Sequence, residues 1–270
     1  MRVLACPVCH FPLSATPGRL GCPNQHHFDL SRWGHVHLSR GRIPSGDTAA
    51  MVQARLRFLA RGHFAPLADT LASIVACRPP TYIVDVGAGP GYYLASLVDR
   101  SPTSSGIAVD VSRHAARQAA RVHPRIASVV ADHHRLPLRD DAIDLVTCVF
   151  APRDPSELHR VLRTTGRCLV VTPSPSHLSE LRGRYGGLAI EPNKRERLLR
   201  TFAPWFELAR TTQLELSLCL TPEDIADALA MGPAAFHPDR IAAPASESLQ
   251  TTAAFAIFEL VPRPVARAVR

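Results

Sequence analysis

The chain has 270 residues and a formal net charge of +8, and 46% of its residues are apolar. This length suits one large domain and one small one, with enough apolar residues for a sizeable core. No run of 18 apolar residues is present, and CPVC follows the N-terminus almost directly, so we expect neither a membrane span nor a secretory signal. The seven cysteines show no disulfide framework, which favours a cytoplasmic protein.

The positive charge is concentrated near the N-terminus. Residues 1–63 contain eight arginines against Asp29 and Asp47, a net +6, while the remaining residues supply only +2. A basic segment in front of a nearly neutral body favours contact with a polyanion such as RNA. The alternative is a solvated basic face, since arginine is abundant throughout this chain and Lys194 is its only lysine.

The first segment, residues 1–38, contains turns around cysteines and short alternating patches, which predict a few short strands organised by a metal ion. Four side chains have the spacing of a tetrahedral zinc site, C-x2-C-x12-C-x3-H: Cys6, Cys9, Cys22 and His26. With four protein ligands the site is closed and structural, and it stabilises a module whose core is too small to fold alone. His10 and His27 are alternative fourth ligands, and buried free cysteines are the interpretation without metal.

A linker and a helical stretch follow this zinc-binding module. Residues 39–46 are polar and rich in Gly and Pro, which predicts a linker, and the second domain is expected over 47–270. From Asp47 to Val75 the apolar spacing predicts helix, with Asp47 as the N-cap and a break at 61–66.

Strands and helices then alternate from residue 81. Strands are expected at 82–87, 106–112, 126–132, 142–150 and 167–173. Intervening helices are expected at 91–99, before 121 and near 155–163. This order predicts an α/β fold with a mostly parallel, Rossmann-like sheet covered by helices on both faces.

The C-terminal third is expected to close the sheet. A polar helical insertion is predicted at 174–205, and 206–218 and 253–260 resemble an antiparallel closing pair. A helix over 222–230 lies between them, with Thr221 as its N-cap and a proline in its first position.

A glycine-rich loop joins the first predicted strand to its helix. It reads Asp85-x-Gly87-x-Gly89-x-Gly91, and such glycines let the backbone approach a ligand at the helix N-terminus. The alternating glycines lack the G-x-G-x-x-G spacing of NAD-binding domains, and the acidic residue before them suits the amino acid end of S-adenosylmethionine.

Two further strand ends support S-adenosylmethionine as the cofactor. Asp110 ends the second strand, where a carboxylate can accept from both ribose hydroxyls, and Asp132 and His133 close the third strand, where adenine would lie. Taken singly, Asp110 or Asp132 is equally well explained as a capping or surface carboxylate.

With these motifs the chain resembles the 23S rRNA guanine-N1 methyltransferases, a family that includes the tylosin-resistance methyltransferase. The resemblance covers nearly the whole chain and rests on CPVC…CPNQHHFDL, GDTAAMVQARLRFLARGHFAPL, VDVGAGPGYY, HRLPLRDDAIDLV, FAP and TPSPSHLSELR. Other members have GCGEG where this chain has GAGPG, which removes one carboxylate but keeps the glycines.

The resemblance implies a class I methyltransferase domain behind a zinc-binding module, with zinc on the four ligands named above. It implies cofactor contacts at four positions: Phe64, Gly91, Tyr92 and His177. It further implies methylation of a guanine N1 in a domain II hairpin of 23S ribosomal RNA, a homodimer, and resistance to tylosin-type macrolides.

Guanine N1 lies on the Watson–Crick edge, so the base must be unpaired or extruded to be reached. Phe150 and Pro152 follow the fourth strand and are predicted to receive it, although Phe150 is equally well explained by core packing. No residue is identified as catalytic. His133, His134 and Asp154 are positional candidates for the acceptor of the N1 proton.

Six arginines bracket the linker, with only Asp47 expected to oppose them, and are predicted to hold the RNA: Arg32, Arg40, Arg42, Arg55, Arg57 and Arg61. Some of them could instead pack the helix at 47–60 against the main domain. Two other functions stay open at this point. One is a small-molecule methyltransferase with a structural zinc, and the other is a non-catalytic RNA-binding protein.

Overall fold

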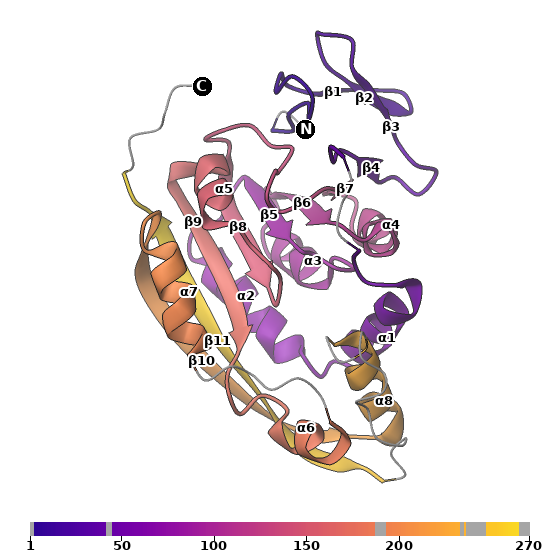
Figure 1. Ribbon diagram of the computed structural model, residues 1–270, viewed down its shortest axis with the longest axis vertical. Helices are drawn as coiled ribbons and strands as arrows, with labels where there is room; N and C mark the ends of the chain where they lie inside the picture. Colours follow the sequence, from indigo (N-terminus) through magenta and orange to yellow (C-terminus); the bar gives the residue numbers. More distant parts are fainter. Residues whose placement is uncertain (1–2, 42–44, 187–192, 233–234, 236–246, 265–270) are drawn as a thin grey trace.

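The protein forms an eight-stranded sheet with helices on both faces and a small three-stranded sheet beside one edge (Figure 1). The structure is a computed structural model and describes residues 3–41, 45–186, 193–232, 235 and 247–264. Among these residues no helix is long and apolar enough to cross a membrane.

The large sheet has the strand order β10-β11-β9-β8-β5-β6-β7-β4. In that order the strands span Phe206–Leu220, Leu249–Pro262, Leu162–Pro173, Ile143–Val149, Tyr82–Val86, Ser105–Asp110, Ile126–Val130 and Val36–His37. Neighbouring strands from β9 to β4 are parallel, whereas β11 is antiparallel to both β9 and β10. The mostly parallel sheet with an antiparallel closing pair is therefore confirmed.

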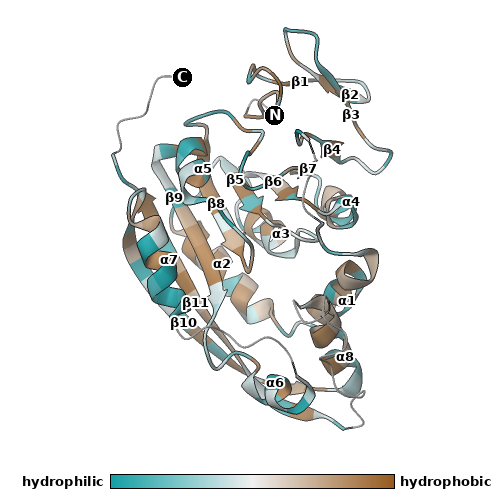
Figure 2. Ribbon diagram, viewed as in Figure 1, coloured by the Kyte–Doolittle hydropathy of each residue, from teal (hydrophilic) through white to brown (hydrophobic). Residues whose placement is uncertain are grey.

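The helices cover both faces of the large sheet. They are α1 to α8 in chain order, at Ala49–Ala60, Ala65–Ala76, Tyr92–Asp99, Arg113–Val122, Pro155–Val161, Ser179–Tyr185, Lys194–Phe202 and Pro222–Met231. In β5, Ile83 packs in one hydrophobic cluster with α2 and α3, whereas Val84 packs in another on the opposite face. Successive side chains of a strand point to opposite faces, so a strand covered on both sides must be apolar throughout. In Figure 2 the central strands are mostly hydrophobic, whereas the outer face of α7 is hydrophilic.

The predicted break at 61–66 separates α1 from α2, but the predicted cap of α1 is wrong. Thr48 is the N-cap, because its hydroxyl accepts from the backbone N–H of Met51 at 3.3 Å. The carboxylate of Asp47 instead accepts from the guanidinium of Arg55. The predicted cap of α8 is confirmed, since Thr221 and Asp224 form a capping box.

The N-terminal segment folds as short strands β1 (Ser14–Thr16), β2 (Arg19–Gly21) and β3 (His27–Asp29), which form the small antiparallel sheet. It does not stand apart from the large sheet. Val36 and His37 form β4, which pairs in parallel with β7, and Leu4 bridges Leu138.

Candidate functional site

The four predicted zinc ligands come together between the two turns that carry them. The Sγ atom of Cys9 lies 3.6 Å from that of Cys22, and Nδ1 of His26 lies 3.4 Å from Cys22 Sγ and 3.6 Å from Cys6 Sγ. Bonds of about 2.3 Å to sulfur and about 2.0 Å to nitrogen place tetrahedral ligand atoms roughly 3.5–3.8 Å apart. The donor set and its spacing therefore fit one zinc ion.

The alternative fourth ligands are not in this cluster, whose members are the three cysteines and His26. His27 is a β3 residue whose ring packs against Gly21: a Cβ on that glycine would lie 2.9 Å from the ring. The local backbone explains the choice, because Gln25 adopts a left-handed conformation (φ 60°) and so closes the turn that presents His26.

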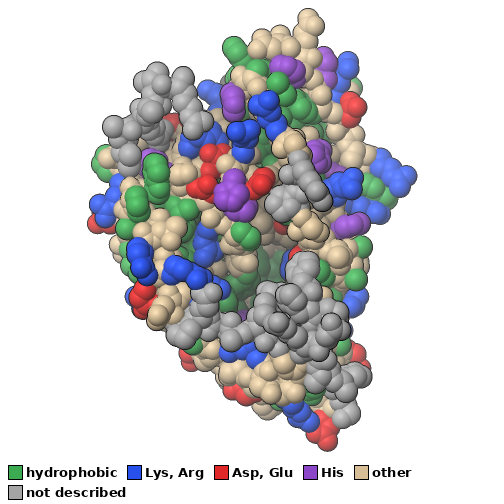
Figure 3. Space-filling view, viewed as in Figure 1, with side chains coloured by type: hydrophobic (Ala, Val, Ile, Leu, Met, Phe, Trp, Pro, Cys, Tyr) green, Lys and Arg blue, Asp and Glu red, His purple; other side chains and the backbone are tan. Residues whose placement is uncertain are grey.

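A cavity of about 810 Å³ opens at the carboxyl ends of the parallel strands, and Figure 3 shows the hollow near the centre of that face. This edge is where open α/β sheets bind ligands. Most predicted cofactor and target-base residues line the cavity: Phe64, Asp85, Gly87, Gly89, Tyr92, Asp110, His133, Phe150, Pro152 and His177. Gly91 and Asp132 lie beside it, in the loop and after β7, without lining it.

The glycine loop has the backbone shape that only glycine supplies. Gly87 has φ 72°, and a Cβ there would lie 2.3 Å from the Cβ of Ala151. Gly91 has φ 85° and is the N-cap of α3. A Cβ at Gly91 would lie 3.2 Å from the Cβ of Ala119, so the two glycines let the loop pack closely against Ala151 and α4 while it borders the cavity.

Asp110 stands at the end of β6 as predicted. One carboxylate oxygen accepts from the backbone N–H of Gly89 at 2.8 Å and the other from that of Ser112 at 2.8 Å. Burial raises the pKa of this carboxyl, and the two N–H groups oppose the rise. The carboxylate thus ties the glycine loop to the second strand and faces the cavity.

Asp85 is buried at the end of β5, with 1% of its surface exposed. It accepts a hydrogen bond from the hydroxyl of Thr147 at 2.7 Å. Burial raises the pKa of Asp85 to about 7, and the nearby Asp110 adds to the rise. A carboxyl poised in this way gains most from a positively charged ligand, such as the amino group of an amino acid.

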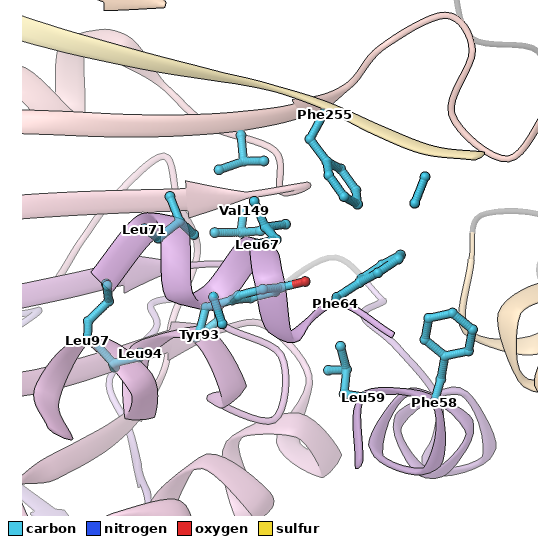
Figure 4. Close-up of a cluster of buried hydrophobic side chains, with 14 of the residues drawn as sticks. Phe58, Leu59, Phe64, Leu67, Leu71, Tyr93, Leu94, Leu97, Val149 and Phe255 are labelled. Carbon is cyan, nitrogen blue, oxygen red and sulfur yellow. The ribbon is translucent and has the colours of Figure 1, made fainter. Parts of the chain in front are cut away.

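Aromatic side chains from distant parts of the chain gather at the cavity. Phe64, which precedes α2, meets Phe255 of β11 edge to face at 5.1 Å between ring centres (Figure 4). His177 lies 4.9 Å from Phe255, and Phe150 lies 5.6 Å from it. Phe255 carries no local sequence signal, and the sequence reasoning missed it.

Phe150 is not a core residue. It is 40% exposed, lines the cavity and has φ 57°, an outlier for a bulky side chain. Such backbone strain concentrates at functional sites, where the surrounding structure holds it in place. The alternative of core packing is therefore wrong for Phe150.

His177 is a neutral hydrogen-bonding group. Its Nδ1 accepts from the backbone N–H of Ala254 at 3.2 Å, which leaves the ring proton on Nε2. Burial, reinforced by the positive charge of Arg182, lowers the pKa of His177 to about 4.

The three candidate proton acceptors divide between two places. His133 lines the cavity, and burial followed by the neighbouring His134 lowers its pKa. His134 instead lies 3.1 Å from the carboxylate of Asp154, the N-cap of α5. A group of histidines flanked by acidic side chains stands beside the hollow in Figure 3.

Three of the six predicted RNA-binding arginines bind acidic groups of this chain. Arg57 and Arg61 pair with Asp227 of α8, at 2.5 and 2.8 Å. Arg55 pairs with Asp47 and donates to the carbonyl of Met231 at 2.7 Å. The expectation that only Asp47 opposes these arginines is therefore wrong, because α8 supplies carboxylates that pack α1 in place. Arg32 and Arg40 are exposed, and Arg42 lies outside the described residues.

The sheet, the glycine loop and the strand-end carboxylates define a class I S-adenosylmethionine-dependent methyltransferase. A family model described as "Methyltransferase domain" matches residues 83–172, and one described as "RlmA, N-terminal", a zinc ribbon, matches residues 4–39. A solved Bacillus halodurans structure described as a methyltransferase shares the fold, with a TM-score of 0.50 and 19% identity over 73% of this chain and 99% of that chain.

Sequence relatives give the family. The chain is 40% identical to the 23S rRNA (guanine(748)-N(1))-methyltransferase of Streptomyces fradiae, over 88% of each chain. It is 42% identical to a Micromonospora griseorubida protein described as a 23S rRNA (guanine-N(1)-)-methyltransferase, over 93% of this chain and 94% of the relative. The chain belongs to the 23S rRNA (guanine-N1)-methyltransferase family.

Proposed function

We propose that this protein transfers a methyl group from S-adenosylmethionine to N1 of a guanine in a domain II hairpin of 23S ribosomal RNA. The proposal is carried by identity of about 40% over about nine-tenths of the chain to enzymes with this activity. The cavity supports it, because a glycine loop, two carboxylates and a group of aromatic side chains line it.

The loop side is the cofactor half of the cavity. S-adenosylmethionine supplies an activated methyl group when bound. We propose that Asp110 accepts from the ribose hydroxyls and that Asp85 holds the amino group, while the Gly87–Gly91 loop lets the protein backbone approach the ligand. Phe64, Tyr92 and His177 complete this half, and Nε2–H of His177 is the donor it offers.

We propose that the part of the cavity beside Phe150 and Pro152 receives the target base. Phe150 offers an exposed ring, and Pro152 adds an apolar wall, so an extruded guanine can stack there. The chain has to align N1 with the methyl group and exclude water. Of the three candidate proton acceptors, only His133 lines the cavity, and its lowered pKa keeps the imidazole neutral and able to accept.

The exposed arginines Arg32 and Arg40 are proposed to contact the RNA backbone next to the zinc-binding module. The other three described arginines have a structural role in this proposal. Arg55, Arg57 and Arg61 hold α1 in place through their ion pairs with Asp47 and Asp227, and they do not contact phosphate directly.

Primer extension on 23S ribosomal RNA tests the function. Incubation of unmethylated ribosomal RNA with the protein and S-adenosylmethionine is expected to produce one strong stop in domain II, because a methyl group on N1 blocks base pairing. RNA incubated without the cofactor is the control. A chain that binds this RNA without producing a stop would be a non-catalytic RNA-binding protein, and one that consumes the cofactor only with small substrates would be a small-molecule methyltransferase.

Replacement of Asp110 with alanine is expected to weaken S-adenosylmethionine binding by about 1.5–3 kcal/mol, because hydrogen bonds to a charged group are lost. Calorimetric titration measures the change. Asp99→Ala is the matched control: Asp99 is an exposed carboxylate at the far end of α3, and its loss is expected to leave the affinity unchanged. Equal affinity of the Asp110→Ala variant and the unmodified chain, or preference of the latter for NAD, would contradict the cofactor assignment.

The resemblance also implies a homodimer and resistance to tylosin-type macrolides. Both stay predictions, checked by light scattering of the purified chain and by the drug tolerance of a sensitive host that expresses it.

A further inference from the structure

The outer face of α4 is a basic stripe. Three arginines follow one another at intervals of four residues: Arg113, Arg117 and Arg121. Residues spaced in this way lie on one face of a helix, about 6 Å apart along its axis. The opposite face consists of buried alanines, Ala115, Ala116 and Ala119, so the arginines take no part in the core.

The stripe continues onto the N-terminal segment through Trp33. The guanidinium carbon of Arg117 lies 3.5 Å from the centre of the Trp33 ring. Those of Arg32 and Arg121 lie 4.8 and 5.6 Å from it. One indole ring thus holds three positive charges together by cation–π attraction.

This surface has a strong unneutralised positive charge. Its four guanidinium groups belong to Arg32, Arg113, Arg117 and Arg121. Among the described residues no carboxylate lies within 4.0 Å of any of them, whereas Arg57 and Arg61 are paired with Asp227. His35 and His37 lie beside the stripe, and burial followed by the neighbouring positive charges, Arg113 among them, lowers the pKa of both rings. Figure 3 shows Lys, Arg and His side chains at the edge of the molecule where α4 and β4 lie.

The stripe starts at the rim of the cofactor cavity. Val111 lines that cavity, and α4 begins two residues later. The N-terminal end of the stripe is therefore within reach of a polymer that enters the cavity. Of its arginines, only Arg32 belongs to the basic N-terminal segment that was predicted to contact RNA.

We propose that Arg32, Trp33, Arg113, Arg117 and Arg121 form a docking surface for the phosphate backbone of the RNA strand that flanks the target hairpin. The inference rests on the proposed function, because it takes RNA as the substrate. A guanidinium group can donate two parallel hydrogen bonds to two oxygens of one phosphate. A regularly spaced row of such groups therefore suits the successive phosphates of a nucleic acid backbone better than a single anion. The Trp33 ring holds the guanidinium groups of Arg32, Arg117 and Arg121 together in this row.

The test is a titration of a fluorescently labelled synthetic RNA, the domain II hairpin with its flanking strands, at several salt concentrations. Arg113→Gln, Arg117→Gln and Arg121→Gln are combined in one variant. The salt slope is expected to fall by about 2, with an affinity loss on the order of tenfold or more, since each phosphate contact contributes about 0.7–0.9 to the slope. Cofactor affinity is expected to stay unchanged.

A matched variant controls for the loss of three charges. It carries Arg195→Gln, Arg200→Gln and Arg210→Gln, three exposed arginines on α7 and β10 at the opposite side of the sheet (Figure 1). Its RNA affinity is expected to stay within about twofold of the unmodified chain, because these charges lie more than a Debye length from α4. A triple lysine variant at the α4 positions is expected to restore most of the salt slope.

Three results would overturn the proposal. One is unchanged RNA binding by the α4 variant, and another is an equal loss in the α7 and β10 variant. The third is equal competition by polyglutamate, which would make the surface a site for acidic proteins. Failure of the proposed function is separate: a chain that binds the hairpin through α4 but gives no primer-extension stop would keep this surface and lose the activity.

Discussion

Replacement of Cys9 with serine is expected to empty the zinc site and to unfold the segment that carries β1 to β3. The hydroxyl of serine is a poor zinc ligand, and the apparent binding free energy of structural zinc is about 10–16 kcal/mol in small peptides. The small sheet contributes few buried apolar side chains of its own, so little else stabilises it. Elemental analysis of protein purified without added zinc is expected to show that the zinc content falls from one ion per chain to nearly none.

Cys219→Ser is the control, because Cys219 is an exposed cysteine on β10 and is not near the cluster. Its zinc content and its thermal unfolding are expected to match those of the unmodified chain. Full zinc occupancy in the Cys9→Ser variant would overturn the ligand assignment. The zinc ligands would then have to include another residue, such as His10 or His27.

Replacement of Asp85 with asparagine is expected to have two effects of opposite sign. It stabilises the cofactor-free protein, and it weakens S-adenosylmethionine binding. The folded-state pKa of Asp85 is about 7, whereas its ordinary value is 3.8. Between these values the unfolded chain has lost the proton and the folded chain still holds it. Stability therefore falls as pH rises through this window, by about 4 kcal/mol in total between roughly pH 4 and pH 7.

Asparagine carries no charge at any pH, so this loss is absent in the variant. Thermal unfolding of both proteins from pH 5 to pH 8 is expected to show a stability difference that grows with pH. Calorimetry at pH 8 is expected to show weaker cofactor binding, because the variant lacks the carboxylate that would hold the amino group. Equal pH dependence of the two proteins would show that Asp85 is already ionised when folded.

Thr147→Val provides an independent check on the same carboxyl. The Thr147 hydroxyl donates to Asp85 and lowers its pKa, so its removal is expected to raise that pKa further. The window in which stability falls should then extend to higher pH, without any change in the acidic residue itself.

The parts of this fold that were predicted correctly depend on local sequence. The strand, glycine loop and helix from Tyr82 to Asp99 follow from a buried apolar run, a turn that needs glycines and an amphipathic helix. The zinc site follows in the same way, because its two ligand pairs each come from one short turn. These features are periodic or closely spaced, and neighbouring residues determine them.

The parts that were missed depend on contacts between distant segments. Arg57 meets Asp227 across 170 positions, and no period in the sequence connects them. Phe255 packs against Phe64 of the cavity only because β11 enters the sheet next to β9. Trp33 meets Arg117 because β4 adds to the edge of the sheet beside α4, and two residues of strand are too short to be recognised from periodicity.

The position of β11 also orders the events of biosynthesis. It is the last strand of the described residues, yet it lies inside the sheet between β9 and β10. It packs Phe255 behind the aromatic side chains of the cavity and supplies a backbone donor to His177. β10 can therefore pair, and His177 can receive its backbone hydrogen bond, only after β11 has been synthesised. One late strand thus completes both the antiparallel edge of the sheet and this part of the site.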